Sequence, residues 1–299
     1  MKRWPVESEY GDMDDNTLEV TLLGTGSPIF VPGRYSISTL IRAGDEYLLF
    51  DCGRGASIRL HETGLHPGHI NKLFLTHLHS DHVVGIPDFY ISGWFTTFGR
   101  RQGPLRVWGP EGSAAMMSNL DQTFKFDEGV RAAEMQIHHN ANETHDIEPG
   151  VIFDEAGIRV TAFYVDHRPI VPALGFKVEF AGRSIVLSGD TRPTESVVEH
   201  GAGADLLIHE VICGDKENSP DPAQYERIIA HHTTPQQAGD IFTKARPGLA
   251  VYSHVILLAG ADSEMLELQT RETYEGPLLV GEDLTRIIIS DEITVECLN

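Results

Sequence analysis

The chain has 299 residues, 41% of them hydrophobic, which is enough to bury a large core. Its 23 basic and 44 acidic residues give a formal net charge of −21, and this charge argues against a surface built to bind nucleic-acid phosphates. No apolar run of about 18 residues predicts a transmembrane helix, and the first residues lack the apolar region of a signal peptide.

Cysteine usage indicates the compartment. Cys52, Cys213 and Cys297 are widely spaced and odd in number, which fits a reducing cytoplasm better than a disulfide framework. We therefore expect a cytoplasmic protein with no membrane partner. The length favours a single domain over residues 1–299, in which residues 1–17 form an N-terminal extension.

The first half of the chain predicts strands that alternate with helices. The glycine turn at 24–28 lacks the lysine of a phosphate-binding loop, so we interpret it as a tight turn. The expected strands are 18–23, 36–42, 46–50, 72–76 and 105–108, and the expected helices are 55–63, 83–95 and 112–120.

The second half repeats this pattern after residues 121–148, a polar segment that predicts no element and in which His138 and His139 favour a surface loop. Expected strands are 158–165, 175–180, 184–187, 204–208 and 250–253, followed by a β-rich run at 284–295; expected helices are 234–244 and 263–274. Because both halves collect polar residues at strand ends, we expect two similar α/β halves that share one site at their seam.

One short stretch carries the strongest chemical signal. His77, His79, Asp81 and His82 lie within six residues, directly after the strand predicted at 72–76. Side chains at this spacing on one turn can converge on a metal ion. Four ligands are too many for one catalytic zinc that keeps an open position, so the motif favours two metals. The alternative is a polar loop whose histidines cap the next helix.

Three later residues could complete a two-metal site. His167, Asp190 and His254 each follow a predicted strand. Each of them taken alone could equally be a helix cap or a turn former.

Taken together, these motifs resemble the metallo-β-lactamase fold, and most closely its ribonuclease Z-like branch. The similar segments span about residues 18 to 290 and include Leu23-Gly24-Thr25-Gly26, Phe50-Asp51-Cys52-Gly53, residues 76–82, His167, Ser188-Gly189-Asp190-Thr191, His209-Glu210 and Ser253-His254. The resemblance implies a four-layer αββα sandwich of two similar halves.

The resemblance also implies how the metals are held. One metal would bind His77, His79 and His167; the other would bind Asp81, His82 and His254, with Asp190 bridging and Asp51 orienting a ligand histidine. Histidine at position 79, where di-iron flavoproteins of this fold carry glutamate, favours two zinc ions, with manganese or iron as alternatives.

The implied chemistry is ester hydrolysis. Two divalent ions lower the pKa of a shared water towards roughly 7, and Asp81 would orient the resulting hydroxide for attack. The resemblance points to His232 as the acid that protonates the leaving oxygen, with Glu210 fixing its tautomer. The alternative is that His231 and His232 simply form the loop before a helix.

Two features direct the expected substrate away from RNA. Ribonuclease Z enzymes with a tRNA-gripping arm carry a long insertion between the positions of His167 and Asp190, which are only 23 positions apart here. The net charge of −21 also argues against RNA as the substrate. Small-molecule relatives known as arylsulfatases share Gly53-Arg54-Gly55, residues 78–82, Asp166-His167, His231-His232-Thr233 and residues 276–283.

We therefore expect a hydrolase of a small-molecule ester, an aryl sulfate or a phosphodiester, that does not bind nucleic acid and could form a homodimer. Trp94 and Phe95 could line its substrate pocket or belong to the core, and Arg192 could receive a sulfate or phosphate oxygen or pair with nearby carboxylates. The alternatives are a lactonase or carboxylic-ester hydrolase, a ribonuclease Z-type endonuclease, and a non-catalytic metal-containing binding protein.

Overall fold

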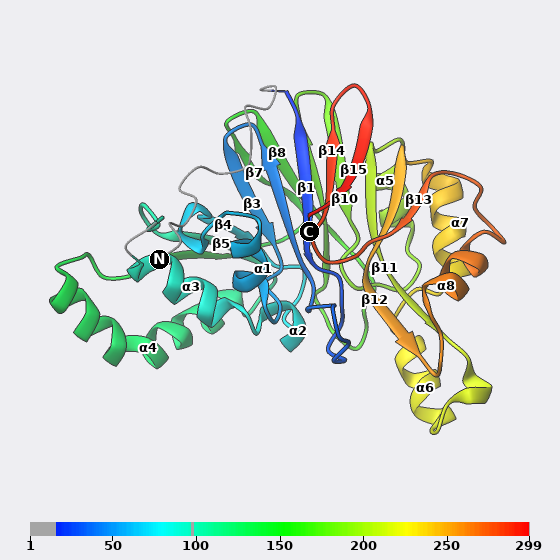
Figure 1. The fold of residues 1–299 in the computed structure, drawn as a ribbon, viewed down its shortest axis with the longest axis horizontal. Helices are drawn as coiled ribbons and strands as arrows, with labels where there is room; N and C mark the ends of the chain where they lie inside the picture. The colour runs from blue at the N-terminus through cyan, green and yellow to red at the C-terminus, as the bar shows by residue number, and fades with distance from the viewer. Residues whose placement is uncertain (1–15, 97–98, 299) are drawn as a thin grey trace.

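Two β-sheets pack face to face and carry helices on both outer faces, as Figure 1 shows for the computed structural model, which describes residues 16–96 and 99–298. The predicted four-layer αββα sandwich of two similar halves is therefore confirmed. The predicted extension at 1–17 lies outside the described residues except for Asn16 and Thr17.

The first sheet has eight strands and combines two kinds of pairing. Its order is β15 (Ile293–Cys297), β14 (Thr285–Ile289), β1 (Leu18–Gly24), β2 (Ser38–Ala43), β3 (Glu46–Phe50), β4 (Lys72–Phe74), β5 (Leu105–Gly109) and β6 (Asn142–Asp146). Strands β3 to β6 pair in parallel, so their carboxyl ends meet at one edge of the sheet.

The second sheet has seven strands and the same mixed character. Its order is β13 (Leu278–Val280), β12 (Leu249–Leu258), β11 (Leu206–Gly214), β10 (Arg183–Leu187), β9 (Leu174–Phe180), β8 (Ile158–Tyr164) and β7 (Gly150–Glu155). Strands β10 to β13 are parallel, so they too present their carboxyl ends at one edge.

An aromatic stack explains why the two sheets hold together near this edge. Phe50, Phe74 and Trp108 occupy paired positions on β3, β4 and β5, so their side chains point to the same face. The rings stack in sequence with centroids 4.9 and 4.8 Å apart, and Phe176 of the opposite sheet lies 5.5 Å from Phe50. These contacts fix the spacing of the two sheets beneath the polar strand ends.

Helices cover the outer faces of both sheets. The first sheet is covered by α1 (Ala56–Glu62), α3 (Ile86–Phe95) and α4 (Ser113–Met135), and the second by α5 (Glu195–Gly201), α7 (Pro235–Ala245) and α8 (Ser263–Thr270). The short helices α2 (Ser80–Val83) and α6 (Pro222–Ile229) lie at the lower rim in Figure 1. The Thr234 side chain caps α7 by accepting from the backbone N–H of Gln237.

Several predicted boundaries are wrong, for identifiable reasons. The helix predicted at 112–120 continues to Met135, because α4 buries few side chains and gives little apolar periodicity to follow. The strands predicted at 204–208 and 250–253 continue to Gly214 and Leu258, past the polar residues that resembled strand ends. No helix in the described part of the chain combines the length and apolar composition that crossing a bilayer requires.

Candidate metal centre

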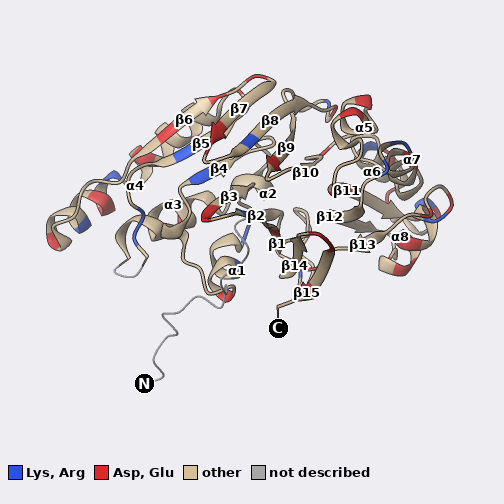
Figure 2. Ribbon diagram, turned by 90° about the horizontal axis from the view of Figure 1, so that it is seen from above, with Lys and Arg blue, Asp and Glu red and all other residues tan. Residues whose placement is uncertain are grey.

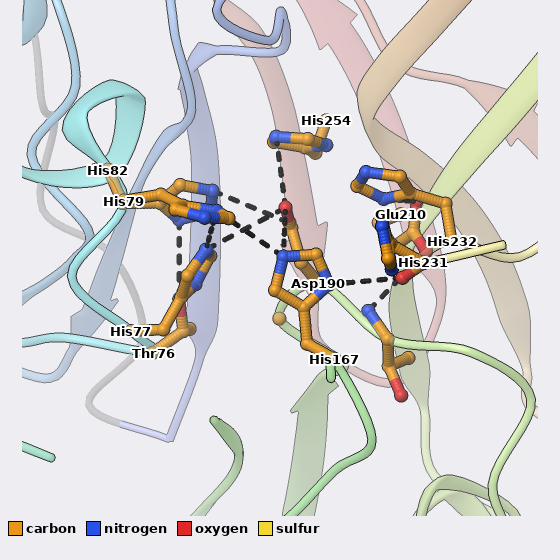
Figure 3. A network of polar contacts seen from close by, with 12 residues as sticks. Thr76, His77, His79, His82, His167, Asp190, Glu210, His231, His232 and His254 are labelled. Carbon is orange, nitrogen blue, oxygen red and sulfur yellow. Dashed lines mark hydrogen bonds and ion pairs between the residues drawn. The ribbon is translucent and has the colours of Figure 1, made fainter. Parts of the chain in front are cut away.

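The predicted ligands converge at the edge where the carboxyl ends of the two sheets meet (Figure 3). The segment after β4 supplies His77, His79, Asp81 and His82, and it faces residues of the second sheet across the seam. His167 follows β8, Asp190 follows β10, and His254 lies within β12. Residues as far apart in the sequence as Asp81 and His254, which are separated by 173 positions, therefore build one cluster.

The first ligand group is His77, His79, His167 and Asp190. The four ligand atoms all lie within 4.8 Å of one another. His77 Nε2 lies 2.9 Å from His79 Nδ1, and His167 Nε2 lies 3.3 Å from the same atom. Asp190 Oδ2 completes the group at 3.9 Å from His77 Nε2 and 3.8 Å from His167 Nε2.

The second ligand group is Asp81, His82 and His254. Asp81 Oδ2 lies 3.1 Å from His254 Nε2 and 3.7 Å from His82 Nε2. Asp190 also faces this group, with Oδ1 3.4 Å from His82 Nε2 and Oδ2 3.4 Å from His254 Nε2. One carboxylate thus lies between both groups, which is the position that a bridging ligand needs.

The spacing of these atoms fits bound metal ions. Ligands held about 2.0–2.1 Å from one tetrahedral zinc lie roughly 3.3 Å from each other, close to the separations within both groups. His82 Nε2 and Asp190 Oδ1 are buried and have no hydrogen-bond partner among the residues that the structure describes. Because buried polar atoms are rarely left without a partner, both atoms are suited to coordinating a cation.

The electrostatics favour the charge states that metal binding requires at His77 and Asp190, whereas His82 must release a proton before it can coordinate. Burial holds the pKa of His77 well below its ordinary value, so the ring is neutral and can coordinate. Burial would raise the pKa of Asp190, but His254 and His82 outweigh it and hold the pKa well below its ordinary value. For His82, the effect of burial is outweighed by Asp190 and Asp51, which raise its pKa well above the ordinary value.

Asp51 and Thr76 set the ring orientations of two ligand histidines. Asp51 Oδ2 accepts from His82 Nδ1 at 2.8 Å and from the Thr76 hydroxyl at 2.8 Å, and Oδ1 accepts from the Thr76 backbone N–H at 2.9 Å. Thr76 Oγ1 lies 3.1 Å from His77 Nδ1. With Nδ1 occupied in this way, both rings present Nε2 to the cluster.

His231 orients the third histidine, a role that the sequence did not reveal. Its backbone carbonyl lies 3.0 Å from His167 Nδ1, so that nitrogen donates and Nε2 is left facing Asp190. The ring of His231 contacts the Arg168 carbonyl at 2.8 Å, which holds the segment in place. No residue type predicts such a role, because any residue can supply a backbone carbonyl.

His232 and Glu210 form a pair at the edge of the cluster. His232 Nδ1 lies 3.2 Å from Glu210 Oε2, and Glu210 is buried and also accepts from the Thr233 backbone N–H at 2.8 Å. A nitrogen of His232 lies within 4.8 Å of the ligand atoms of Asp190 and His254. Burial lowers the pKa of His232, but Glu210 outweighs it and raises the pKa to about 9.

Two backbone features let the strands approach so closely. A Cβ added to Gly53 would lie 2.3 Å from the Asp81 carbonyl oxygen, so only glycine fits between Asp51 and the ligand segment. His254 adopts a φ of 51° where the pairing of β11 and β12 shifts register at Glu210. This bulge re-aims a side chain within a continuous strand, which is common beside active sites.

The three residues suggested as substrate contacts do not lie together: Trp94 and Phe95 belong to α3, and Arg192 lies near the cluster. Trp94 is buried in α3 and donates from Nε1 to the His138 carbonyl at 2.7 Å, and Phe95 is partly buried against the core cluster to which other residues of α3 belong. Both therefore belong to the packing between α3 and its neighbours and not to the cluster. Arg192 lies near the cluster, where it donates to the Arg168 carbonyl at 3.0 Å.

A cavity of about 450 Å³ opens beside the cluster. It includes His167 and extends along Tyr164, Asp166, Arg168 and residues from the turns after β5 and β6. Substrate that reaches the first ligand group would therefore contact this surface.

Comparison with known proteins identifies the relatives of this chain. Residues 18–237 match the sequence model of the family described as Anti-Pycsar protein Apyc1. The chain is 37% identical over 277 residues to a ribonuclease Z of Mycobacterium marinum, covering 90% of this chain and 98% of the relative. A ribonuclease Z of Mycobacterium avium is also 37% identical, over 278 residues, with the same shares covered.

Solved structures agree with the fold. The short form of human tRNase Z is 26% identical with a TM-score of 0.67, covering 91% of this chain and 98% of that one. The metallo-β-lactamase fold protein YhfI from Bacillus subtilis superposes with a TM-score of 0.73 at 18% identity, and the match covers 91% of this chain and 100% of that one. Zinc-bound PqqB from Methylobacterium extorquens superposes with a TM-score of 0.62 at 17% identity, and the match covers 90% of this chain and 99% of that one.

These relatives overturn the expected substrate. The predictions of a small-molecule ester and of no nucleic-acid partner are wrong, because the relatives at 37% identity are ribonuclease Z proteins. The net charge misled because it averages over the whole surface. Figure 2 shows Asp and Glu spread over both ends of the molecule and the strands between them, with Lys and Arg interspersed, whereas divalent cations in the cluster would set the local charge.

Proposed function

Because the chain belongs to the ribonuclease Z-like hydrolases of the metallo-β-lactamase fold, and is a metal-dependent hydrolase of ester bonds, we propose that it cuts phosphodiester bonds of RNA. The observation that carries this proposal is the two-group ligand cluster, complete in a chain 37% identical to ribonuclease Z over 90% of its length. A precursor tRNA is the first substrate to test, since the short human tRNase Z is among the similar structures.

The proposed metals are two zinc ions, held by His77, His79, His167 and Asp190 on one side and by Asp81, His82, His254 and Asp190 on the other. Bound there, they would make water nucleophilic at neutral pH and neutralise the charge of a phosphodiester. Zinc is favoured over manganese or iron by the five histidines of the set, because imidazole suits zinc well.

The residues of the chain prepare the site for this reaction. Asp51 and the His231 carbonyl hold the rings of His82 and His167 in the tautomers that leave Nε2 free to coordinate. Asp81, whose Oδ2 faces His254, is the carboxylate suited to orienting the attacking water. His232 remains protonated at neutral pH through Glu210 and can give a proton to the leaving oxygen.

The test compares two RNAs of equal length, a precursor tRNA with a 3′ extension and an unstructured sequence. Protein loaded with zinc is expected to cut the precursor, and chelation should abolish the cut. Asp190→Ala should be inactive, whereas His139→Ala serves as a control because His139 is exposed and its side chain pairs with Glu128, outside the ligand groups. Failure of folded, zinc-loaded protein to cut either RNA would refute the proposal.

We also propose that the chain acts in the cytoplasm. Its three cysteines support this, since Cys52 and Cys213 are buried and unpaired and Cys297 is exposed and unpaired. Cell fractionation should recover the protein with cytoplasmic markers, and recovery outside the cytoplasm would contradict the proposal.

A further inference from the structure

The cavity beside His167 is formed at the same edge of the sheets as the ligand cluster. Glu111 follows β5, Glu148 lies between β6 and β7, and Tyr164 to Ala173 span the end of β8 and the turn into β9. Its volume of about 450 Å³ is within the range of small-ligand sites in proteins. Because His167 belongs to both, a group bound in this cavity would lie beside the first ligand group.

Charge restricts what the cavity can hold. Its lining includes three carboxylates, Glu111, Glu148 and Asp166, against one cation, Arg168. That guanidinium is already engaged, since its Nε donates to Asp166 Oδ1 at 2.9 Å and Nη2 contacts Oδ2. A second phosphate would be repelled, so the phosphate belongs at the metals and an uncharged part of the substrate belongs in the cavity.

The lining instead offers the two contacts that a nucleobase uses. Tyr164 is 47% exposed and Val171 is 72% exposed, and both line the cavity, so they offer apolar surface to a bound group. Tyr164 donates its hydroxyl proton to Glu148 Oε2, which anchors the ring and the carboxylate to each other. Aromatic rings stack on bases, and carboxylates accept hydrogen bonds from the amino group of cytosine.

We infer that this cavity binds the base of a nucleotide adjoining the cleaved bond, with the Tyr164 ring stacking on the base and Glu148 accepting from its amino group. The inference rests on the proposed action on RNA and names the part of the chain that selects the substrate. It assigns to the short turn between β8 and β9 a base-binding role in place of a long RNA-gripping insertion.

The test uses short RNAs that carry cytosine, uracil or an abasic ribose at each nucleotide beside the cleaved bond. Tyr164→Leu is expected to lower kcat/KM about tenfold on base-bearing RNA, because it removes one stacking contact. The same variant should have no effect when the abasic ribose occupies the recognised position. Tyr164→Phe is the control for the ring, because it keeps the stacking surface and loses only the hydroxyl bond to Glu148, so its loss of kcat/KM should be smaller than that of Tyr164→Leu.

Glu148→Gln tests the polar contact. The wild-type protein should prefer cytosine over uracil about tenfold at the recognised position, and the variant should lose most of that preference. If Tyr164→Leu lowers kcat/KM equally on abasic and base-bearing RNA, or on neither, the base-binding inference is wrong. The proposed cleavage of RNA would still hold in that case. Absence of RNA cleavage by the wild-type protein would instead overturn the proposed function, and this inference with it.

Discussion

Replacing Asp51 by asparagine should weaken metal binding without disturbing the fold. Asp51 has a φ of 55°, a left-handed conformation that asparagine tolerates, and the two side chains have the same shape. The carboxylate accepts three hydrogen bonds, from the Thr76 backbone N–H, the Thr76 hydroxyl and His82 Nδ1. An asparagine amide turns one of the two accepting oxygens into a donor.

The substitution is expected to change the tautomer of His82. If the new NH₂ group faces His82 Nδ1, the ring must move its proton to Nε2, the atom that points towards Asp81 and Asp190. A protonated Nε2 cannot coordinate. Loss of such an orienting partner typically costs 10- to 100-fold in metal affinity or activity, which corresponds to about 1.4–2.8 kcal/mol.

The assay is zinc content per chain after dialysis against chelators of graded strength, followed by RNA cleavage at limiting and at excess zinc. We expect Asp51→Asn to lose zinc at a lower chelator strength than the wild type and to regain part of its activity in excess zinc. Asp121→Asn is the matched control, because Asp121 accepts from Tyr90 and Asn142 away from the cluster. Unchanged zinc affinity together with unchanged activity would refute the reasoning about the tautomer.

Three further outcomes are expected. Glu210→Gln removes the carboxylate that raises the pKa of His232 to about 9, so the alkaline limb of the pH–rate profile should move to lower pH; an unmoved limb would count against His232 as the acid. His232→Ala should slow substrates with poor leaving groups most, and an equal loss across leaving groups would argue against proton donation. Removing metal should lower the thermal midpoint, since ligand at about 100 times its Kd adds ~2.7 kcal/mol; an unchanged midpoint would indicate that the cluster binds no metal in solution.

The ligand segment shows why part of the site could be predicted from the sequence. His77, His79, Asp81 and His82 are adjacent in the chain, so their residue types and spacing already restrict the chemistry. His167, Asp190 and His254 were found through the expectation that polar residues collect at strand ends. For His254 the expectation gave the right residue although the predicted strand end was wrong. His254 lies inside β12 at a bulge and not at the end of a short strand.

Substrate preference could not be predicted in the same way. A net charge is an average over the whole chain, whereas an RNA phosphate meets only the few groups around the cluster. The suggested contacts Trp94 and Phe95 illustrate the same difficulty, because aromatic residues at helical spacing can face a pocket or the core. Only packing decides between these cases, and α3 buries Trp94.

The sequence by itself determined the fold class and the metal-binding chemistry, because both depend on residue types at short spacing and on the alternation of strands and helices. Tertiary structure alone decided the orienting groups and the neighbouring surface. The His231 carbonyl carries no signature in the sequence, and the cavity along Tyr164 and Glu148 exists only where separate turns meet. Contacts between residues far apart in the chain depend on how the sheets pack, and local pattern does not encode that packing.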